Sequence, residues 1–424
     1  MNNLWILYEQ NEIDRNGGFK ALCKGCAGAT GLLIIPQEIP LDTTFPQHPL
    51  THIAHLFKQF PILLAPFKPL QNMADTITIT LGERTFNLDR EKAEEAYAAK
   101  KVLNGRNSMF FNILPLKYNW AYELYREMKN THWEPAEVSV NVDIAQFSQL
   151  SESCQQLYKT ALGAFARSQE LFHSHGIYTV RDLVTAPELK LVFGRFVHEE
   201  NTRSDVLVHL HGSLQINPME CARLAAIPAF TSKEQFVASK LSPLNHDTDT
   251  TTTANKQAVA RNIFLINQCM EGTQVFSLWA SLFSLAAQNK MPGTGKVFHK
   301  LIGDITFRLS LFDQLLQEMV SENPDIWTSA FKDELTGYMV DAVRLEKELI
   351  AALPVADAGL DPEALGIYIE YLSDERLAAC NLPRQYHHAS SPFPWLDEKL
   401  HLASSHTAAI ASSTLDNSFD DDDL

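Results

Sequence analysis

The segment VFSLWASLFSLAAQNK, residues 275–290, constrains the fold most strongly, because it is apolar on nearly every side of the helix it would form. A helix of this kind has to be enclosed by other helices. Helical patterning surrounds it, from about residue 89 to about residue 380. Residues 158–175 and the amphipathic stretch 325–353 are further long helical segments. The chain is therefore predicted to be all-α, with long helices packed as a bundle.

The two ends of the chain differ in composition from the helical middle. Residues 1–88 contain the proline-rich stretches IIPQEIPLDTTFPQHPL and QFPILLAPFKPL, and proline breaks helices. After these stretches, the segment DTITITLGERTF alternates apolar and polar residues, which predicts a short hairpin. Asp89 is expected to cap the first helix of a domain spanning residues 89–400. Residues 401–424 are small, polar and acidic, and they are predicted to form a flexible tail. Inside the helical domain, residues 244–257 are expected to form a polar loop.

Composition excludes several classes of protein. A formal net charge of −16 argues against a nucleic-acid-binding face, which would be basic. No stretch reaches 18 consecutive apolar residues and no signal peptide is visible, so we expect neither a membrane span nor export. Six cysteines without framework spacing fit a reducing compartment, and we expect a cytoplasmic protein. Cys23 and Cys26 form a single CxxC, which indicates either two free thiols or a metal or redox site.

Two arginines stand where a helical core should be apolar. HEENTR, residues 198–203, places Arg203 three residues after Glu200, and GDITFR, residues 303–308, places Arg308 three residues after Ile305. Residues three apart share one helix face. Both arginines are therefore predicted to point toward the interior of the bundle.

Three strings carry a resemblance to a known family: NGRNSMFFNILPLKYNWAYELYREMKNTHWEPAEVS (104–139), EGTQVFSLWASLFSLAAQNKMPGTGKVFHKLIGD (271–304) and YIEYLSDERLAACNLPRQYHHASSPFPWL (368–396). They resemble the small, radical-generating subunit of class I ribonucleotide reductase. The resemblance runs in order from about residue 90 to residue 400, and residues 1–80 show none. It implies a ferritin-like bundle whose helices hold two iron or manganese ions with six side chains, beside a radical tyrosine.

When the metal-ligand positions of the family are carried over one by one, few of them hold a ligand residue in this chain. The tyrosine position falls on Leu207, and the six ligand positions fall on Gln169, Glu200, Arg203, Glu271, Ile305 and Arg308. Only the two glutamates keep a ligand type, since arginine offers donors only and stays protonated. We therefore expect no metal and no cofactor, with Glu200 paired to one arginine and Glu271 to the other. The alternative is a shifted register using Glu199 and nearby histidines, although Thr202 then stands at the histidine position.

The resemblance also implies a radical-transfer path and a docking tail. Trp133 and Asp304 match the path residues, but the histidine that would link them to the metal site is Arg203. No tyrosine follows Tyr386. Trp133 and Asp304 are therefore expected to be structural, with Asp304 beside an arginine. In the tail the resemblance implies docking on the large subunit, with apolar anchors among aspartates at Leu415, Phe419 and Leu424. A merely solubilising acidic end is the alternative.

Three functions stay open at the level of sequence. The first is a ribonucleoside-diphosphate reductase small-subunit homologue that lacks radical-generating activity. It would act in deoxyribonucleotide synthesis as a structural or regulatory partner of the large subunit, as a homodimer or as a heterodimer with an intact small subunit. The second is an active small subunit that uses a non-standard radical or cofactor. The third is a ferritin-like scaffold with an unrelated binding role, in which residues 1–80 carry the new binding function.

Overall fold

A computed structural model describes residues 97–105, 116–171 and 178–400, together with the backbone of five strands between residues 4 and 89. Side chains are described for residues 97–105, 116–168 and 178–398. The chain divides into two compact units, residues 1–93 and 94–424.

The strands of the first unit form two small antiparallel sheets. β1 (Leu4–Leu7), β2 (Phe19–Gly25) and β3 (Thr30–Ile35) make a three-stranded sheet in that order. This sheet was not predicted from the sequence. β4 (Thr76–Leu81) and β5 (Arg84–Asp89) pair as a hairpin, which confirms the alternation seen in DTITITLGERTF.

Asp89 was expected to cap a helix, and that expectation stays a prediction because residues 90–96 lie outside the described part of the chain. Asp89 is the last residue of β5, where it pairs with Thr76. The β alternation of the hairpin therefore extends to residue 89, farther than the polar texture of the following residues suggested. Most of the helix expected immediately after it lies outside the described residues.

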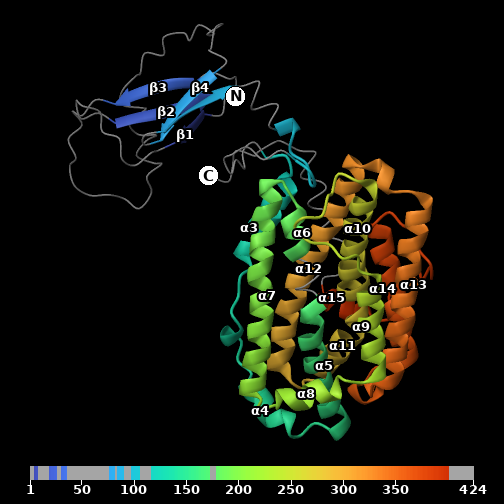
Figure 1. Ribbon diagram of the computed structural model, residues 1–424. Coiled ribbons are helices and arrows are strands. Elements are labelled where there is room, and N and C mark those ends of the chain that lie inside the picture. Colours follow the sequence, from blue (N-terminus) through green and yellow to red (C-terminus); the bar gives the residue numbers. More distant parts are fainter. Residues whose placement is uncertain are drawn as a thin grey trace, which may run out of the picture. The chain divides into compact units, whose positions relative to one another are not determined.

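Long helices build the second unit, as predicted (Figure 1). In chain order the elements are α3 (Asn119–Asn130), η1 (Pro135–Glu137), α4 (Asn141–Phe147), α5 (Glu152–Leu171), α6 (Tyr178–Leu183), α7 (Pro187–Ser213), α8 (Pro218–Leu224), α9 (Pro228–Lys240), α10 (Thr253–Ile263), η3 (Phe264–Gln274), α11 (Phe276–Ala287), α12 (Pro292–Glu322), η4 (Pro324–Ile326), α13 (Ser329–Ala352), η5 (Val355–Ala358), α14 (Pro362–Ala379) and α15 (Pro394–Leu400). None of the described helices is both long and apolar enough to cross a membrane.

The starts of these helices follow capping rules. Proline occupies the first turn of α7, α8, α9, α12 and α14, where the missing N–H costs nothing. Thr252 caps α10 by accepting from the backbone N–H of Asn255, so the polar loop predicted for residues 244–257 ends at residue 252. The Asp143 carboxylate caps α12, accepting from the N–H groups of Gly293 at 2.9 Å and Thr294 at 2.6 Å.

The bundle is closed around α11, as its apolar sequence predicted. Every residue of α11 from Phe276 to Leu285 is buried. α7 and α12 contact each other along one side of the bundle, and α13 packs on α14 along another (Figure 1). Between them η3 continues α10 with the wide turns of a π-helix, and every residue from Phe264 to Gln274 is buried. This arrangement brings the buried faces of α7, η3 and α12 together.

Candidate functional site

The two arginines singled out in the sequence do point into the bundle. Arg203 lies on the buried face of α7 beside Glu200, and Arg308 lies on the buried face of α12. Glu271 reaches them from η3. Arg308 and Glu200 are each only 1% exposed. Three elements far apart in the chain therefore place two guanidinium groups and two carboxylates in one enclosed site.

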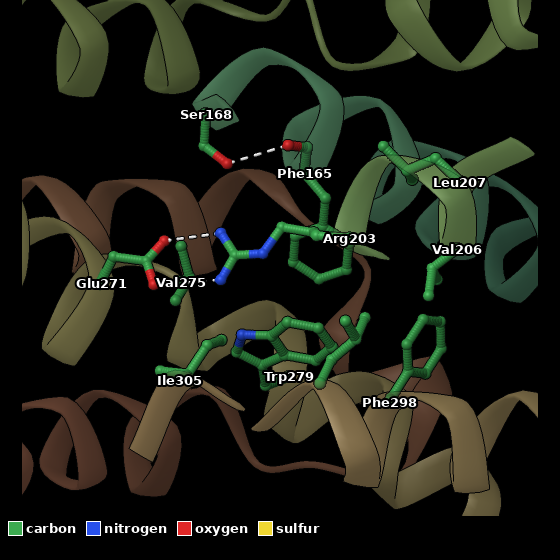
Figure 2. Close-up of a pocket in the computed structure, with 11 residues that line it drawn as sticks. Phe165, Ser168, Arg203, Val206, Leu207, Glu271, Val275, Trp279, Phe298 and Ile305 are labelled. Carbon is green, nitrogen blue, oxygen red and sulfur yellow. Dashed lines mark hydrogen bonds and ion pairs between the residues drawn. The ribbon is translucent and has the colours of Figure 1, made fainter. Parts of the chain in front are cut away.

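Glu271 is the centre of this site. Arg203 donates to both of its oxygens, from Nη1 to Oε1 at 3.0 Å and from Nη2 to Oε2 at 3.3 Å. Figure 2 shows the guanidinium of Arg203 extended toward this carboxylate. Arg308 donates from Nη1 to Oε2 of Glu271 at 3.0 Å, and its Nη2 lies 2.5 Å from Oε1 of Glu200. Arg203 Nη2 lies 3.9 Å from the same oxygen of Glu200.

The expected one-to-one pairing of Glu200 and Glu271 with the two arginines is therefore too simple. Arg308 contacts both carboxylates, and Glu271 contacts both arginines. Spacing along a helix fixes the face on which a side chain lies. It does not fix which of two neighbouring partners a long, forked guanidinium reaches.

The charges of the site balance one another. Burial disfavours the ionised form of Glu271, but the positive charges of Arg203 and Arg308 outweigh it and hold its pKa below the ordinary value. Burial likewise disfavours the charged form of Arg203, and the two glutamates raise its pKa regardless. Burial and the repulsion from Arg203 lower the pKa of Arg308, although Glu200 and Glu271 oppose that shift. An arginine remains charged under such conditions because its ordinary pKa is very high.

This donor set does not fit a pair of metal ions. Among the described residues, the ligand positions implied by the resemblance offer only the oxygens of Glu200 and Glu271, and guanidinium groups contact both carboxylates. Ile305 is a buried aliphatic side chain. The part of the chain with described side chains contains no group of three or more His, Cys, Asp or Glu residues arranged to hold a metal ion. The side chain of Gln169, near the end of α5, lies outside that part.

A small cavity adjoins Arg203 and Glu271. It encloses about 20 Å³, and its wall is mainly apolar, with Phe165, Trp279 and Phe298 among the lining side chains (Figure 2). That volume is about the space that one water molecule needs. Leu207, to which the resemblance assigns the radical-tyrosine position, also lines it and brings no hydroxyl group.

Trp133 and Asp304 lie together beside the ion pairs. The indole Nε1 of Trp133 donates to Oδ2 of Asp304 at 3.1 Å, and both residues are buried. Burial raises the pKa of Asp304 to about 8, and the charge of Glu199 and a hydrogen bond with it add to the shift. The charge of Arg308 pulls the pKa the other way. The expectation of an acid near an arginine was therefore incomplete, because the direct neighbour of Asp304 is a second carboxyl group.

Glu199 is the residue that sequence reasoning underused. The sequence indicates it only as a candidate ligand in a shifted register, yet it is buried and accepts from Nε of Arg195 at 2.9 Å. A signal was available, because Arg195 and Glu199 are four residues apart and share a helix face. The anchors Leu415, Phe419 and Leu424 lie outside the described residues.

Comparisons with known proteins agree with this architecture. The family described as ribonucleotide reductase, small chain, matches residues 110–392. A curated relative, the ribonucleoside-diphosphate reductase subunit beta of Chlamydia pneumoniae, is 26% identical over 73% of this chain and 91% of its own length. The curated relatives also include small chain 2 from Saccharomyces cerevisiae, 23% identical over 74% of this chain and 86% of its own length.

A solved structure shares the fold. The ribonucleotide reductase R2 subunit from Clostridium botulinum superposes with a TM-score of 0.63 at 23% identity, covering 71% of this chain and 94% of that chain. Likeness at this level of identity shows a common ferritin-like bundle. The family match covers more than half of the chain and includes the elements that carry Glu200, Glu271 and both arginines. This chain therefore belongs to the ribonucleotide reductase small-chain family.

Proposed function

We propose that this chain is a small-subunit homologue of ribonucleoside-diphosphate reductase that binds no metal pair and generates no tyrosyl radical. It acts as a structural or regulatory partner in deoxyribonucleotide synthesis in the cytoplasm. The observation that supports this proposal is the pairing of Arg203 and Arg308 with Glu271 and Glu200 in the centre of the bundle.

Electrostatics argue for this assignment. A site for two cations needs an excess of carboxylates, whereas two arginines beside two glutamates leave no negative charge to attract a cation. A bound metal ion would face guanidinium groups at close range, in a medium that screens charge poorly. The arginines thus fill the electrostatic role of the metal ions, and the bundle keeps a neutral core.

The partners follow from the family and from the tail. We assign to this chain a complex with a ribonucleotide reductase large subunit, through a tail anchored by Leu415, Phe419 and Leu424. The bundle, residues 89–400, is assigned to pairing with a second small subunit, either a copy of itself or an intact relative. A solved relative of the same fold, from Saccharomyces cerevisiae, is described as the Rnr4 homodimer, at a TM-score of 0.57 and 20% identity.

Metal loading tests the proposal directly. The purified chain is offered Fe(II) or Mn(II) without oxygen, then exposed to oxygen, and bound metal and the EPR spectrum are recorded. We expect near-zero metal and no radical signal. Binding of about two metal ions per chain would overturn the proposal. A radical without metal would instead establish an active subunit with a non-standard cofactor.

A restored variant provides the matched control. Gln169→Glu, Arg203→His, Ile305→Glu and Arg308→His together rebuild the ligand types that the resemblance implies at these positions. This variant is expected to take up metal under the conditions in which the unmodified chain does not. Copurification with a large subunit, measured in parallel, separates a partner of the reductase from a scaffold with an unrelated role.

A further inference from the structure

A basic groove lies on the bundle away from the buried arginines. It is formed by the first turns of α12, the end of α11 and the segment around η1, and it is an open groove of about 790 Å³. Lys296, His299 and Lys300 form its basic side, and all three are exposed. They fall at spacings of three and four residues on α12, so they share one face of that helix.

The floor of the groove is apolar. Phe283, Ala286 and Pro292 line it together with Val138. A carboxylate, Glu137, also lines the groove, and its Oε2 accepts from the backbone N–H of Glu134 at 3.4 Å. The groove therefore combines an apolar floor with a cationic side, which suits a peptide that carries both an aromatic side chain and acidic ones.

The N-terminus of α12 is not the source of this attraction. Its first free N–H groups, on Gly293 and Thr294, are already satisfied by the Asp143 carboxylate. The cationic character belongs to the side chains of the helix face, and Lys300 also covers the ring of Trp133, with its Nζ 5.6 Å from the ring centroid. A free phosphate is thus a poorer match than an extended acidic segment that follows the helix face.

The chain itself contains such a segment. Residues 401–424 hold five aspartates and no lysine or arginine, and Phe419 lies between Asp416 and the run Asp420–Asp423. We propose that this acidic segment docks in the basic groove of its own bundle, with Phe419 on the apolar floor and the aspartates against Lys296 and Lys300. While it is docked, the tail cannot bind other partners, so this contact inhibits partner binding by the chain's own tail.

The length of the chain permits this contact. α15 ends at Leu400 and packs against α12. α12 has 31 residues, so no point on it lies farther than about 46 Å along its axis from another. The twenty residues from Leu400 to Asp420 span up to roughly 66–72 Å when extended. Tethering also raises the effective concentration of the segment to the millimolar range, so a weak intrinsic affinity is sufficient.

The test uses full-length chains and a labelled peptide. The probe is a fluorescein-labelled peptide of residues 405–424, and fluorescence anisotropy reports its binding. In the tail-neutral chain, Asp416 and the run Asp420–Asp423 are changed to Asn, so the groove is open. We expect this chain to bind the peptide at least about tenfold more tightly than the unmodified chain, in which the native tail competes. Binding should weaken as salt increases.

A second substitution locates the contact. Lys296→Glu with Lys300→Glu, added to the tail-neutral chain, is expected to abolish peptide binding. The matched control is Lys129→Glu with Lys240→Glu, which reverses the same number of charges at exposed positions away from the groove and should leave binding intact. Circular dichroism checks that each chain is folded.

Three results would overturn the proposal. The first is equal peptide binding by the unmodified and tail-neutral chains. The second is binding that survives the reversal of Lys296 and Lys300. The third is a competition that depends on protein concentration, which would mean that the tail docks on a second copy. None of these outcomes depends on metal content, so the inference stands or falls separately from the proposed function.

Discussion

At the scale of single residues, the buried site depends on Glu271. Its two oxygens receive three guanidinium contacts, from Arg203 and Arg308, while Glu200 receives the close contact from Arg308. A buried ion pair adds little net stability compared with an apolar core, but the removal of one partner leaves an uncompensated charge. Among the residues of this site, the loss of Glu271 would therefore leave the most buried charge without a partner.

Glu271→Gln is expected to lower the free energy of unfolding by about 3–5 kcal/mol, because it leaves two buried arginines facing a single carboxylate. Urea denaturation measures the change. The control is Arg344→Ala, since Arg344 makes only exposed pairs with Asp341 and Glu348 and should cost no more than about 1 kcal/mol. If both substitutions change the free energy of unfolding by a similar amount, the charge of Glu271 does not balance the buried arginines as inferred.

The raised pKa of Asp304 predicts that the stability of the fold depends on pH. An unfolded aspartate titrates near 3.8, whereas burial and the neighbouring Glu199 raise the pKa of folded Asp304 to about 8. The folded state therefore binds the carboxyl proton of Asp304 more tightly than the unfolded state does. The stability that this protonation contributes is fully present below pH 3.8 and is lost as the pH rises through about 8. The unfolding midpoint of the unmodified chain should fall over this range.

Asp304→Asn removes the titrating group and should flatten that decline. Thermal unfolding followed at a series of pH values compares the two chains. An equal slope in both would assign the pH dependence to other groups and leave Asp304 ionised in the folded protein.

Sequence reasoning placed these residues but not their contacts. The spacing of Glu200 and Arg203 gave the correct helix face, because a helix repeats every 3.6 residues. The convergence of Arg308 on both carboxylates depends on the rotamer of a long side chain and on the position of η3. The proximity of Glu199 to Asp304 depends on how α7 and α12 pack, which no local pattern records.

At the scale of elements, the patterns that depend on one helix were predictable and those that depend on neighbours were not. α11 was recognised as enclosed because it has no polar face. The wide turns of η3 were not predicted, since a π-helical segment keeps an apolar sequence and changes only its hydrogen bonding. The sheet β1–β3 was missed because proline-rich surroundings dominated the interpretation of its short strands.

The contact between α5 and α8 gives an element-scale prediction. A Cβ added at Gly163 would lie 2.2 Å from the backbone oxygen of Cys221, so Gly163→Ala must push the two helices apart. We expect a loss of about 1–3 kcal/mol in the free energy of unfolding. Gly337→Ala is the matched control, because Gly337 is an exposed residue within α13 with no atom within 4 Å of the added Cβ.

Gly337→Ala should instead stabilise the chain by about 0.5–1 kcal/mol, since alanine is the better helix former. Urea denaturation of both variants decides the point. A stabilising effect at both positions would mean that α5 and α8 are not in close backbone contact.

At the scale of the whole molecule, the chain joins two units of different kinds. Residues 94–424 form one compact unit, and its described core runs from Val102 to Leu396. The family match, residues 110–392, lies wholly within this unit. The buried ion pairs and the basic groove also belong to it. The proposed partner role and the tail contact are therefore properties of the second unit alone.

A chain lacking residues 1–88 tests this division. It should retain its helical circular dichroism spectrum, because every described helix lies beyond residue 88. Its thermal midpoint should stay within about 2–4 °C of that of the full chain, the shift that about 1 kcal/mol produces in a medium-sized domain. Peptide binding by its tail-neutral form should also be unchanged. A large loss of stability would instead show that the first unit packs on the bundle and completes its core.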